Sequence, residues 1–126
     1  MKADRTKLAQ LGALQRLARM IGEADRAALA SADRARQSTE AEIARLIGTE
    51  TAAREIAASA GDSALLQVAE RYSDLSARNR AALAQRLTEE TSRRAVCHDA
   101  ACRSFGVQAA LDRLHAKMRA GAKGPR

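Results

Sequence analysis

One short break interrupts a sequence that otherwise has the pattern of continuous helix. The break is Ser59-Ala60-Gly61-Asp62-Ser63. Gly61 can adopt the positive φ that ends a helix, and Asp62 or Ser63 can cap the helix that follows. The break leaves two helical segments of nearly equal length, about 4–58 and 63–120, the first with Asp4 as its expected N-cap. Because a short connection between helices of equal length makes them antiparallel neighbours, the sequence predicts a helical hairpin.

The composition supports an all-α fold. Alanine supplies 31 of the 126 residues, and the chain has one Pro, one Phe, one Tyr and no Trp. Strands need β-branched and aromatic residues that are scarce here, whereas Ala, Leu, Arg, Glu and Gln favour helix. We therefore predict one domain, 1–126, made of two long helices that form an antiparallel coiled-coil hairpin with its turn near 59–63. So few large side chains leave little to line a substrate pocket, so we expect no enzymatic activity, no catalytic residue and no cofactor.

Apolar and small residues recur at steps of three and four along the first segment, as in a coiled-coil seam. One polar residue, Asp25, interrupts the pattern, and an extra step near Thr39–Ile43 resembles a stutter. The expected seam positions are Leu11, Leu14, Ala18, Ile21, Asp25, Ala28, Ala32, Ala35, Thr39, Ile43, Leu46 and Ile47.

The second segment repeats the pattern clearly at both ends and weakly between Glu89 and Arg103. Two alternatives stay open for residues 89–106: a continuous helix, or a kink at Gly106 followed by a third short helix from about 107. Gly121, Gly124 and Pro125 should end the last helix and leave a frayed basic tail, 121–126. The expected seam positions are Leu65, Val68, Tyr72, Leu75, Asn79, Ala82 or Leu83, Leu87, Val107, Leu111, Leu114 and Met118.

The net charge of +7 is concentrated at the two ends of the chain. Residues 1–20 have a formal charge of +4 and residues 103–126 a charge of +5, whereas residues 21–102 have a charge of −2. A chain that folds back at Gly61 brings the two basic ends together. Such a concentration of positive charge suits an acidic socket and steers docking into it.

Two cysteines and two histidines lie close together in the second segment: Cys97, His98, Cys102 and His115. Four such ligands can hold zinc, but on a continuous helix Cys97 lies about 100° round the axis from His98. Only a kink at Gly106 would bring His115 back toward the others. We therefore expect both cysteines to pack as small apolar residues and predict no metal site, with these four residues as the alternative ligands.

Motifs of nucleotide binding and of zinc proteases are absent, because the chain has no GxxxxGK[ST], no GxGxxG and no HExxH. The basic ends leave nucleic-acid binding open as an alternative function. Against it, the chain lacks the aromatic residues on which bases stack and a short recognition helix after a turn.

This pattern resembles the FliJ-type family, the central-stalk proteins of flagellar and type III export ATPases. The resemblance lies in the basic amphipathic start Lys2–Ile21 with its leucines at 8, 11, 14 and 17, in the Ser59–Ser63 turn, and in Leu111-x2-Leu114-x3-Met118 before a basic tail. It implies that the basic termini dock in the pore of a hexameric ATPase ring while the hairpin reaches toward an export-gate protein.

By charge, the residues that would face the ring are Arg5, Lys7, Arg16, Arg19, Arg113, Lys117 and Arg119. By the same resemblance, the side chains that would hold the two termini together are Leu11, Leu14, Leu111, Leu114 and Met118.

The alternative function with the same fold is a coiled-coil chaperone or adaptor for exported or other cytoplasmic proteins. The pattern also leaves open whether the hairpin is a monomer or swaps segments into a dimer, since the seam is the same in both. With no apolar stretch long enough for a secretory leader or a membrane span, we expect a cytoplasmic protein. The resemblance implies that it is peripheral at the inner-membrane export apparatus.

Overall fold

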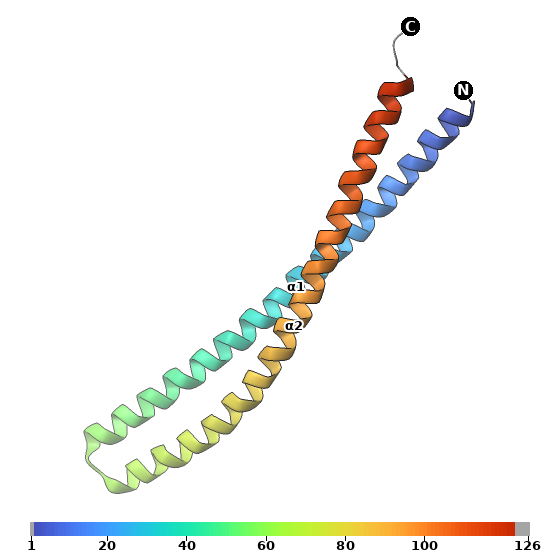
Figure 1. Ribbon diagram of the computed structural model, residues 1–126. Coiled ribbons are helices and arrows are strands. Elements are labelled where there is room, and N and C mark those ends of the chain that lie inside the picture. Colours follow the sequence, from blue (N-terminus) through green and yellow to red (C-terminus); the bar gives the residue numbers. More distant parts are fainter. Residues whose placement is uncertain (1, 123–126) are drawn as a thin grey trace. The chain divides into compact units, whose positions relative to one another are not determined.

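The computed structural model describes residues 2–122, and within that range the chain contains two helices and no strand. Helix α1 spans Lys2–Ala60 and helix α2 spans Ser63–Ala122 (Figure 1). The predicted all-α hairpin is confirmed. The sequence predicted Asp4 as the N-cap of this helix. Because α1 begins at Lys2, Asp4 instead lies inside the first turn. A carboxylate there still favours the helix, since it faces the positive end of the helix dipole.

The turn between the helices is shorter than the five residues expected from the sequence. Gly61 has a φ of +64°, the left-handed conformation that glycine adopts without strain. The Asp62 carboxylate accepts a hydrogen bond from the backbone N–H of Ala64 at 2.9 Å, and its carbonyl accepts one from Leu66 N–H at 3.1 Å. Gly61 therefore ends α1, and Asp62 is the N-cap of α2.

Helix α2 continues without interruption through residues 89–106, so of the two alternatives the continuous helix is observed, and no third helix begins at about 107. Gly106 lowers helix propensity by up to about 1 kcal/mol relative to alanine, a cost that a helix of 60 residues tolerates at one position. Gly121 and Ala122 are helical, which corrects the predicted start of the basic tail. The rest of that tail, 123–126, lies outside the described residues.

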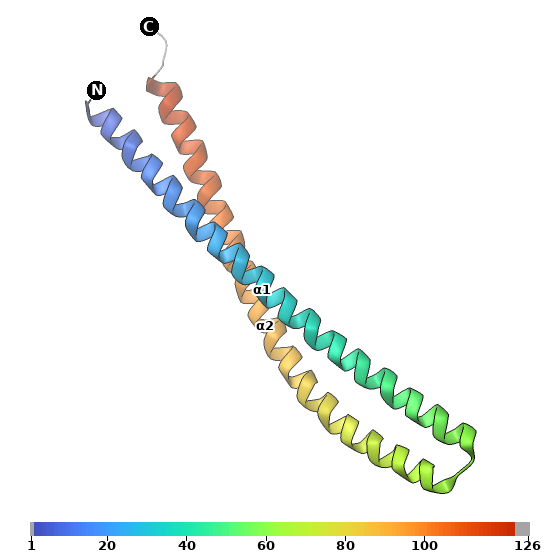
Figure 2. The same cartoon turned by 180° about the vertical axis from the view of Figure 1, so that it is seen from behind.

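The chain divides into two compact units, each described here by itself. The terminal unit consists of Met1–Ser31 and Ala95–Arg126, and the loop unit consists of Ala32–Arg94. In each unit a segment of α1 and a segment of α2 lie side by side and run in opposite directions, as the two opposed views show (Figures 1 and 2). In the terminal unit, the start of α1 and the end of α2 therefore lie at the same end.

The seam of the terminal unit repeats in alternating steps of four and three, as in a coiled coil. Leu11 and Ala18 are its buried apolar residues. The other residues that line it are buried or half-buried: Gln15, Gly22, Asp25 and Leu29 of α1, and Cys97, Ala101, Ser104, Gln108, Leu111, His115 and Met118 of α2.

Several large residues that the sequence pattern predicts in the seam of the terminal unit lie outside it. Leu14, Ile21 and Leu114 are about half exposed, and they lie one position away from Gln15, Gly22 and His115, which take the seam positions. The physical reason is close packing at Gly22. A Cβ there would come within 3.2 Å of the Gln108 side chain, so the helices meet over a residue without a side chain.

The seam of the loop unit keeps the same spacing and shows that the predicted stutter near Thr39–Ile43 is wrong. After Leu46 the next seam residue is the buried Glu50, whereas Ile47 is 47% exposed. The residues that line this seam are Ala32, Arg36, Thr39, Ile43, Leu46, Glu50, Ala53 and Ala57 of α1, and Ala69, Ser73, Ser76, Arg80, Leu83, Leu87, Glu90 and Arg94 of α2.

Polar residues therefore occupy many of the seam positions of the loop unit. In α2 the seam residues are Ser73, Ser76 and Arg80. The residues expected there, Tyr72, Leu75 and Asn79, each precede one of these by one position. The apparently weak stretch after Glu89 is also part of the seam, through Glu90, Arg94 and Cys97 of the same helix. The spacing of three and four residues between seam positions continues there, but the residues at those positions are mostly polar.

Candidate partner-binding surface

The terminal unit contains the whole net charge of the chain. It holds 12 basic and 5 acidic residues, a formal charge of +7, whereas the loop unit holds 10 of each sign and is neutral. Hairpin folding thus brings both basic ends into one unit, as the sequence predicted.

The seven cationic residues expected to bind a partner all lie exposed in the terminal unit, on both helices: Arg5, Lys7, Arg16 and Arg19 of α1, and Arg113, Lys117 and Arg119 of α2. Within residues 2–122, no Lys or Arg of the terminal unit forms a salt bridge. These charges are therefore available to an anionic partner.

Two carboxylates of the terminal unit, those of the half-buried Asp25 and the exposed Asp112, accept hydrogen bonds from neutral side chains. Ser104 donates a hydrogen bond to the Asp25 carboxylate, and Gln15 Nε2 donates one to Asp112 Oδ1 at 2.7 Å. Neither carboxylate neutralises an arginine. Asp25, the polar break in the sequence pattern, is thus a half-buried seam residue that α2 satisfies with a hydroxyl.

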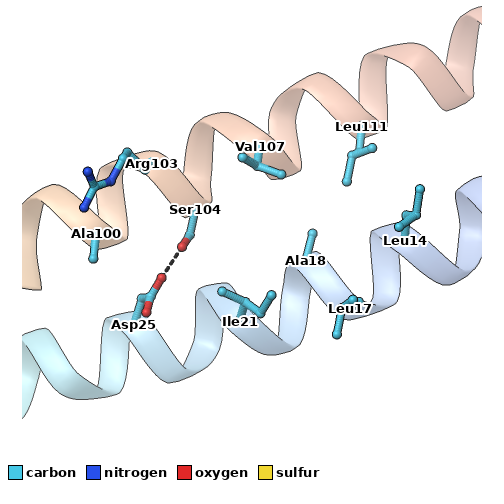
Figure 3. Close-up of a pocket in the computed structure, with 10 residues that line it drawn as sticks. All are labelled: Leu14, Leu17, Ala18, Ile21, Asp25, Ala100, Arg103, Ser104, Val107 and Leu111. Carbon is cyan, nitrogen blue, oxygen red and sulfur yellow. Dashed lines mark hydrogen bonds between the residues drawn. The ribbon is translucent and has the colours of Figure 1, made fainter.

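Beside the seam, the terminal unit has an apolar groove with a volume of about 350 Å³ (Figure 3). Its apolar lining comes from both helices: Leu14, Leu17 and Ile21 of α1, and Ala100, Val107 and Leu111 of α2. Asp25, Ser104 and Arg103 lie at one end of it. These half-exposed aliphatic side chains form an apolar surface that is open to solvent, which makes the groove a candidate contact surface.

In the loop unit, by contrast, five of the ten arginines pair with carboxylates, either across the seam or along one helix. The buried Thr39 is the centre of one cluster: its hydroxyl contacts a carboxylate oxygen of Glu90 and accepts a hydrogen bond from Arg86 Nε at 3.3 Å. The guanidinium of Arg86 also lies 3.0 Å from Glu42 Oε2 and 3.5 Å from Glu90 Oε1. Four polar residues from two helices thus satisfy one another.

Glu50 is the centre of a second cluster, with only 8% of its side chain exposed. Arg80 of α2 lies 3.0 Å from Oε2 and Arg54 lies 2.9 Å from Oε1. Arg54 Nε also donates to the Ser73 hydroxyl at 3.0 Å. Desolvation opposes the charge on Glu50, but a hydrogen bond from Ser73 and the two arginines outweigh it, so the pKa of Glu50 lies below its usual value.

Asp33 is the centre of a third cluster near the other end of the loop unit. Its carboxylate accepts a hydrogen bond from Arg94 Nε at 2.8 Å and lies 3.2 Å from Arg36 Nη2. These two hydrogen bonds lower the pKa of Asp33. Arg36 also reaches Glu40 Oε1 at 2.7 Å, and its own pKa is raised, first by Asp33 and then by Glu40.

The four candidate metal ligands do not converge within the described residues. Cys102 Sγ lies 3.9 Å from the ring nitrogens of His98, one helical turn away, whereas Cys97 and His115 take seam positions on the other side of α2. Both thiols are free. No group of three or more His, Cys, Asp or Glu suited to a metal ion is found in the part of the chain that the structure describes.

The apolar groove of the terminal unit is one feature that the sequence pattern did not predict. The signal was present, because Leu14 and Ile21 are seven residues apart, as are Ala100 and Val107. Residues seven apart lie on the same face of a coiled-coil helix. Large aliphatic residues usually occupy a seam, so the pattern predicts these residues there, whereas the seam is formed by their neighbours Gln15, Gly22 and Gln108.

Comparison with known proteins gives no match to a family model, to a curated protein or to a solved structure. Neither described helix contains a stretch that is both long enough and apolar enough to cross a membrane.

Proposed function

We propose that this protein is a non-enzymatic docking and coupling protein, and that its terminal unit binds an acidic surface of a hexameric protein-export ATPase. The observation that carries the proposal is the contrast in charge: the terminal unit has a net charge of +7 and no salt-bridged Lys or Arg among its described residues. The identity of the partner comes from the resemblance to the FliJ-type family.

The physical mechanism is electrostatic steering followed by close contact. Unpaired guanidinium groups form bidentate hydrogen bonds to carboxylates, and the field of several like charges accelerates encounter with an acidic socket. Both helices contribute to this basic surface, through Arg16 and Arg19 of α1 and Arg113 and Arg119 of α2. In this proposal the protein is cytoplasmic, peripheral at the export apparatus, and the loop unit reaches an export-gate protein.

The test is a titration of the full chain against the purified hexameric export ATPase of the same cells, with binding and ATP hydrolysis both measured. The double variant Arg16→Glu/Arg119→Glu should weaken binding by about a hundredfold, because like charges then face the socket. The matched control is Arg45→Glu/Arg78→Glu in the loop unit, where both side chains are exposed and form no salt bridge.

The control makes the same change in net charge and should alter the affinity by no more than about threefold. Equal losses in the two double variants would contradict the assignment of the interface to the terminal unit. Absence of binding to the ATPase by the unmodified chain at about 50 mM salt would reject the ATPase as partner.

A coiled-coil chaperone or adaptor for exported or other proteins is the second candidate, and the apolar groove beside the seam favours it. Such a protein would bind unfolded or helical segments of its substrates and would leave ATP hydrolysis by the ring unchanged. The same titration therefore separates the two candidates, since only the coupling protein should alter turnover.

A further inference from the structure

The groove of the terminal unit is open to solvent although its lining is aliphatic. Leu14, Leu17 and Ile21 are 51–52% exposed, and Val107 is 54% exposed. In Figure 3 the side chains of Ile21 and Leu14 stand along one wall and those of Val107 and Leu111 along the other. Neither α1 nor α2 covers this surface, because their contact uses the neighbouring seam positions.

The dimensions of the groove suit one α-helix. The lining residues of α1 extend from Leu14 to Asp25, which corresponds to about 17 Å at 1.5 Å per residue. That is about three helical turns. A third helix that presents apolar residues at every third and fourth position would bury the aliphatic wall, in the way that amphipathic helices bind grooves between two others.

The charge around the groove selects among occupants. Arg103 lines the same groove and forms no salt bridge within the described residues, since the nearby Asp25 is bound by Ser104. A second copy of the chain would place one unit of charge +7 against another. A helix with acidic residues beside its apolar stripe would instead pair with Arg103 and with the general positive field.

We propose that this groove binds an amphipathic helix of about three turns from an acidic protein partner, with aliphatic residues in the groove and a carboxylate on Arg103. The inference deepens the proposed function and rests on its acidic partner. It adds a second kind of contact, in which apolar burial fixes the position of a complex that charge brings together.

The test uses the full chain and a synthetic 18-residue peptide. In this peptide, successive leucines are alternately three and four residues apart, so that they form one apolar stripe, and Glu residues lie beside that stripe. Two further peptides serve as comparison: a scrambled peptide of the same composition, and one with Lys in place of Glu. Binding is followed by fluorescence anisotropy and by methyl chemical shifts. Only the acidic amphipathic peptide should bind, and the shifted methyl groups should be those of Leu14, Ile21 and Val107.

Adjacent residues supply a matched pair of variants. Ile21→Asp places a charge in the groove and should weaken peptide binding by about tenfold or more. Met20→Asp makes the same substitution at a residue that is 66% exposed and outside the groove, and should change the affinity by less than about twofold. Arg103→Glu should also weaken binding of the acidic peptide. Arg26→Glu, which changes a residue outside the groove, should lower the affinity for this peptide by less.

Three results would overturn the inference. Equal binding of the scrambled peptide would mean that charge alone acts, and equal binding of the Lys peptide would mean that charge does not select. A dimer in sedimentation equilibrium that Ile21→Asp dissociates and Met20→Asp does not would show that a second copy fills the groove.

The outcomes separate this inference from the proposed function. If the peptide binds at the groove but the ATPase does not bind the chain, the groove assignment stands and the ATPase assignment fails. If Arg16→Glu/Arg119→Glu abolishes ATPase binding while the unmodified chain binds no peptide, the groove assignment fails alone.

Discussion

The loop unit and the terminal unit are built from the same two helices, yet among the described residues only the loop unit contains arginines that are paired with carboxylates. In the loop unit, Arg36, Arg54, Arg80, Arg86 and Arg94 each lie within 3.5 Å of a carboxylate. In the terminal unit, no arginine among the described residues does so. Half of the arginines of the loop unit thus pair with carboxylates of their own helix or of the other one, whereas the described arginines of the terminal unit form no such pair.

The comparison also explains how a small-residue seam specifies one alignment of its helices. An alanine seam buries little area and permits sliding by a heptad, because one alanine resembles the next. Paired polar groups remove that freedom: Thr39 meets Arg86 and Glu90 in one register only, and Glu50 meets Arg80 likewise. We infer that the polar clusters of the loop unit set the register there.

The largest effect is expected from removal of the buried leucine of the terminal unit. Leu11 is only 5% exposed and is the largest of the buried apolar residues. Leu11→Ala should lower the free energy of unfolding of this unit by about 2–3 kcal/mol, because it leaves a cavity between the helices. Urea denaturation combined with residue-resolved amide exchange would measure the loss and assign it to the unit.

Leu17→Ala is the matched control for that experiment, since Leu17 is 52% exposed and lies outside the seam. It should cost less than about 1 kcal/mol. Equal losses in the two variants would contradict the seam register described for the terminal unit.

The second effect tests the polar seam of the loop unit. Thr39→Val keeps the shape of the side chain but removes the hydroxyl shared by Arg86 and Glu90. The unfolding free energy should fall by about 1–2 kcal/mol, because buried polar groups lose a partner. Thr49→Val is the control: its exposed hydroxyl bonds only to the Arg45 carbonyl, and its loss should be close to neutral.

These two predictions show what the sequence could and could not supply. Helix content and the Gly61–Asp62 turn follow from local chemistry, because propensity, φ and capping depend on neighbouring residues. The seam register does not, since it depends on which side chains satisfy each other across helices. Thr39 was assigned to the seam correctly, but Glu50 was missed because a carboxylate there makes sense only once Arg80 is known to face it.

The basic surface of the terminal unit was likewise predictable only in part from the sequence. The exposed cations of the terminal unit follow from counting charges at the two ends of the chain. That they lack carboxylate partners does not follow from counting, because Asp25 and Asp112 are engaged by Ser104 and Gln15 only in the folded pair of helices.

A third effect follows from the carboxylates of the loop unit. The pKa values of Asp33 and Glu50 are lowered in the folded chain, so each binds protons more tightly when the chain is unfolded. Their contribution to stability is complete above the unfolded pKa, near pH 4–4.5, and is lost as the pH falls through the lower folded value.

Amide exchange corrected for intrinsic pH dependence should therefore show the loop unit losing protection between about pH 5 and 3. The variant Glu50→Gln should already lack part of that protection at pH 7 and should show a shallower loss on acidification. A pH dependence unchanged by this substitution would contradict the role assigned to the Glu50 cluster.

The smallest expected effect is the change in stability when a glycine is replaced by alanine, which should differ between a glycine with open space around it and one in close contact with the other helix. Nothing lies within 4 Å of a Cβ added at Gly48 in the loop unit, so Gly48→Ala should stabilise the helix by up to about 1 kcal/mol through propensity alone. At Gly22 in the terminal unit the added Cβ would come within 3.2 Å of the Gln108 side chain, which must move by a few tenths of an ångström. Gly22→Ala should therefore gain clearly less than Gly48→Ala, in thermal or urea denaturation.

Gly106→Ala is the control that distinguishes the two possible origins of such a difference. Gly106 belongs to the terminal unit, like Gly22, but has open space around it, like Gly48. If the close approach of Gln108 is the cause, Gly106→Ala should gain as much as Gly48→Ala. If Gly106→Ala instead gains as little as Gly22→Ala, the difference belongs to the unit as a whole, and the close packing assigned to Gly22 is wrong.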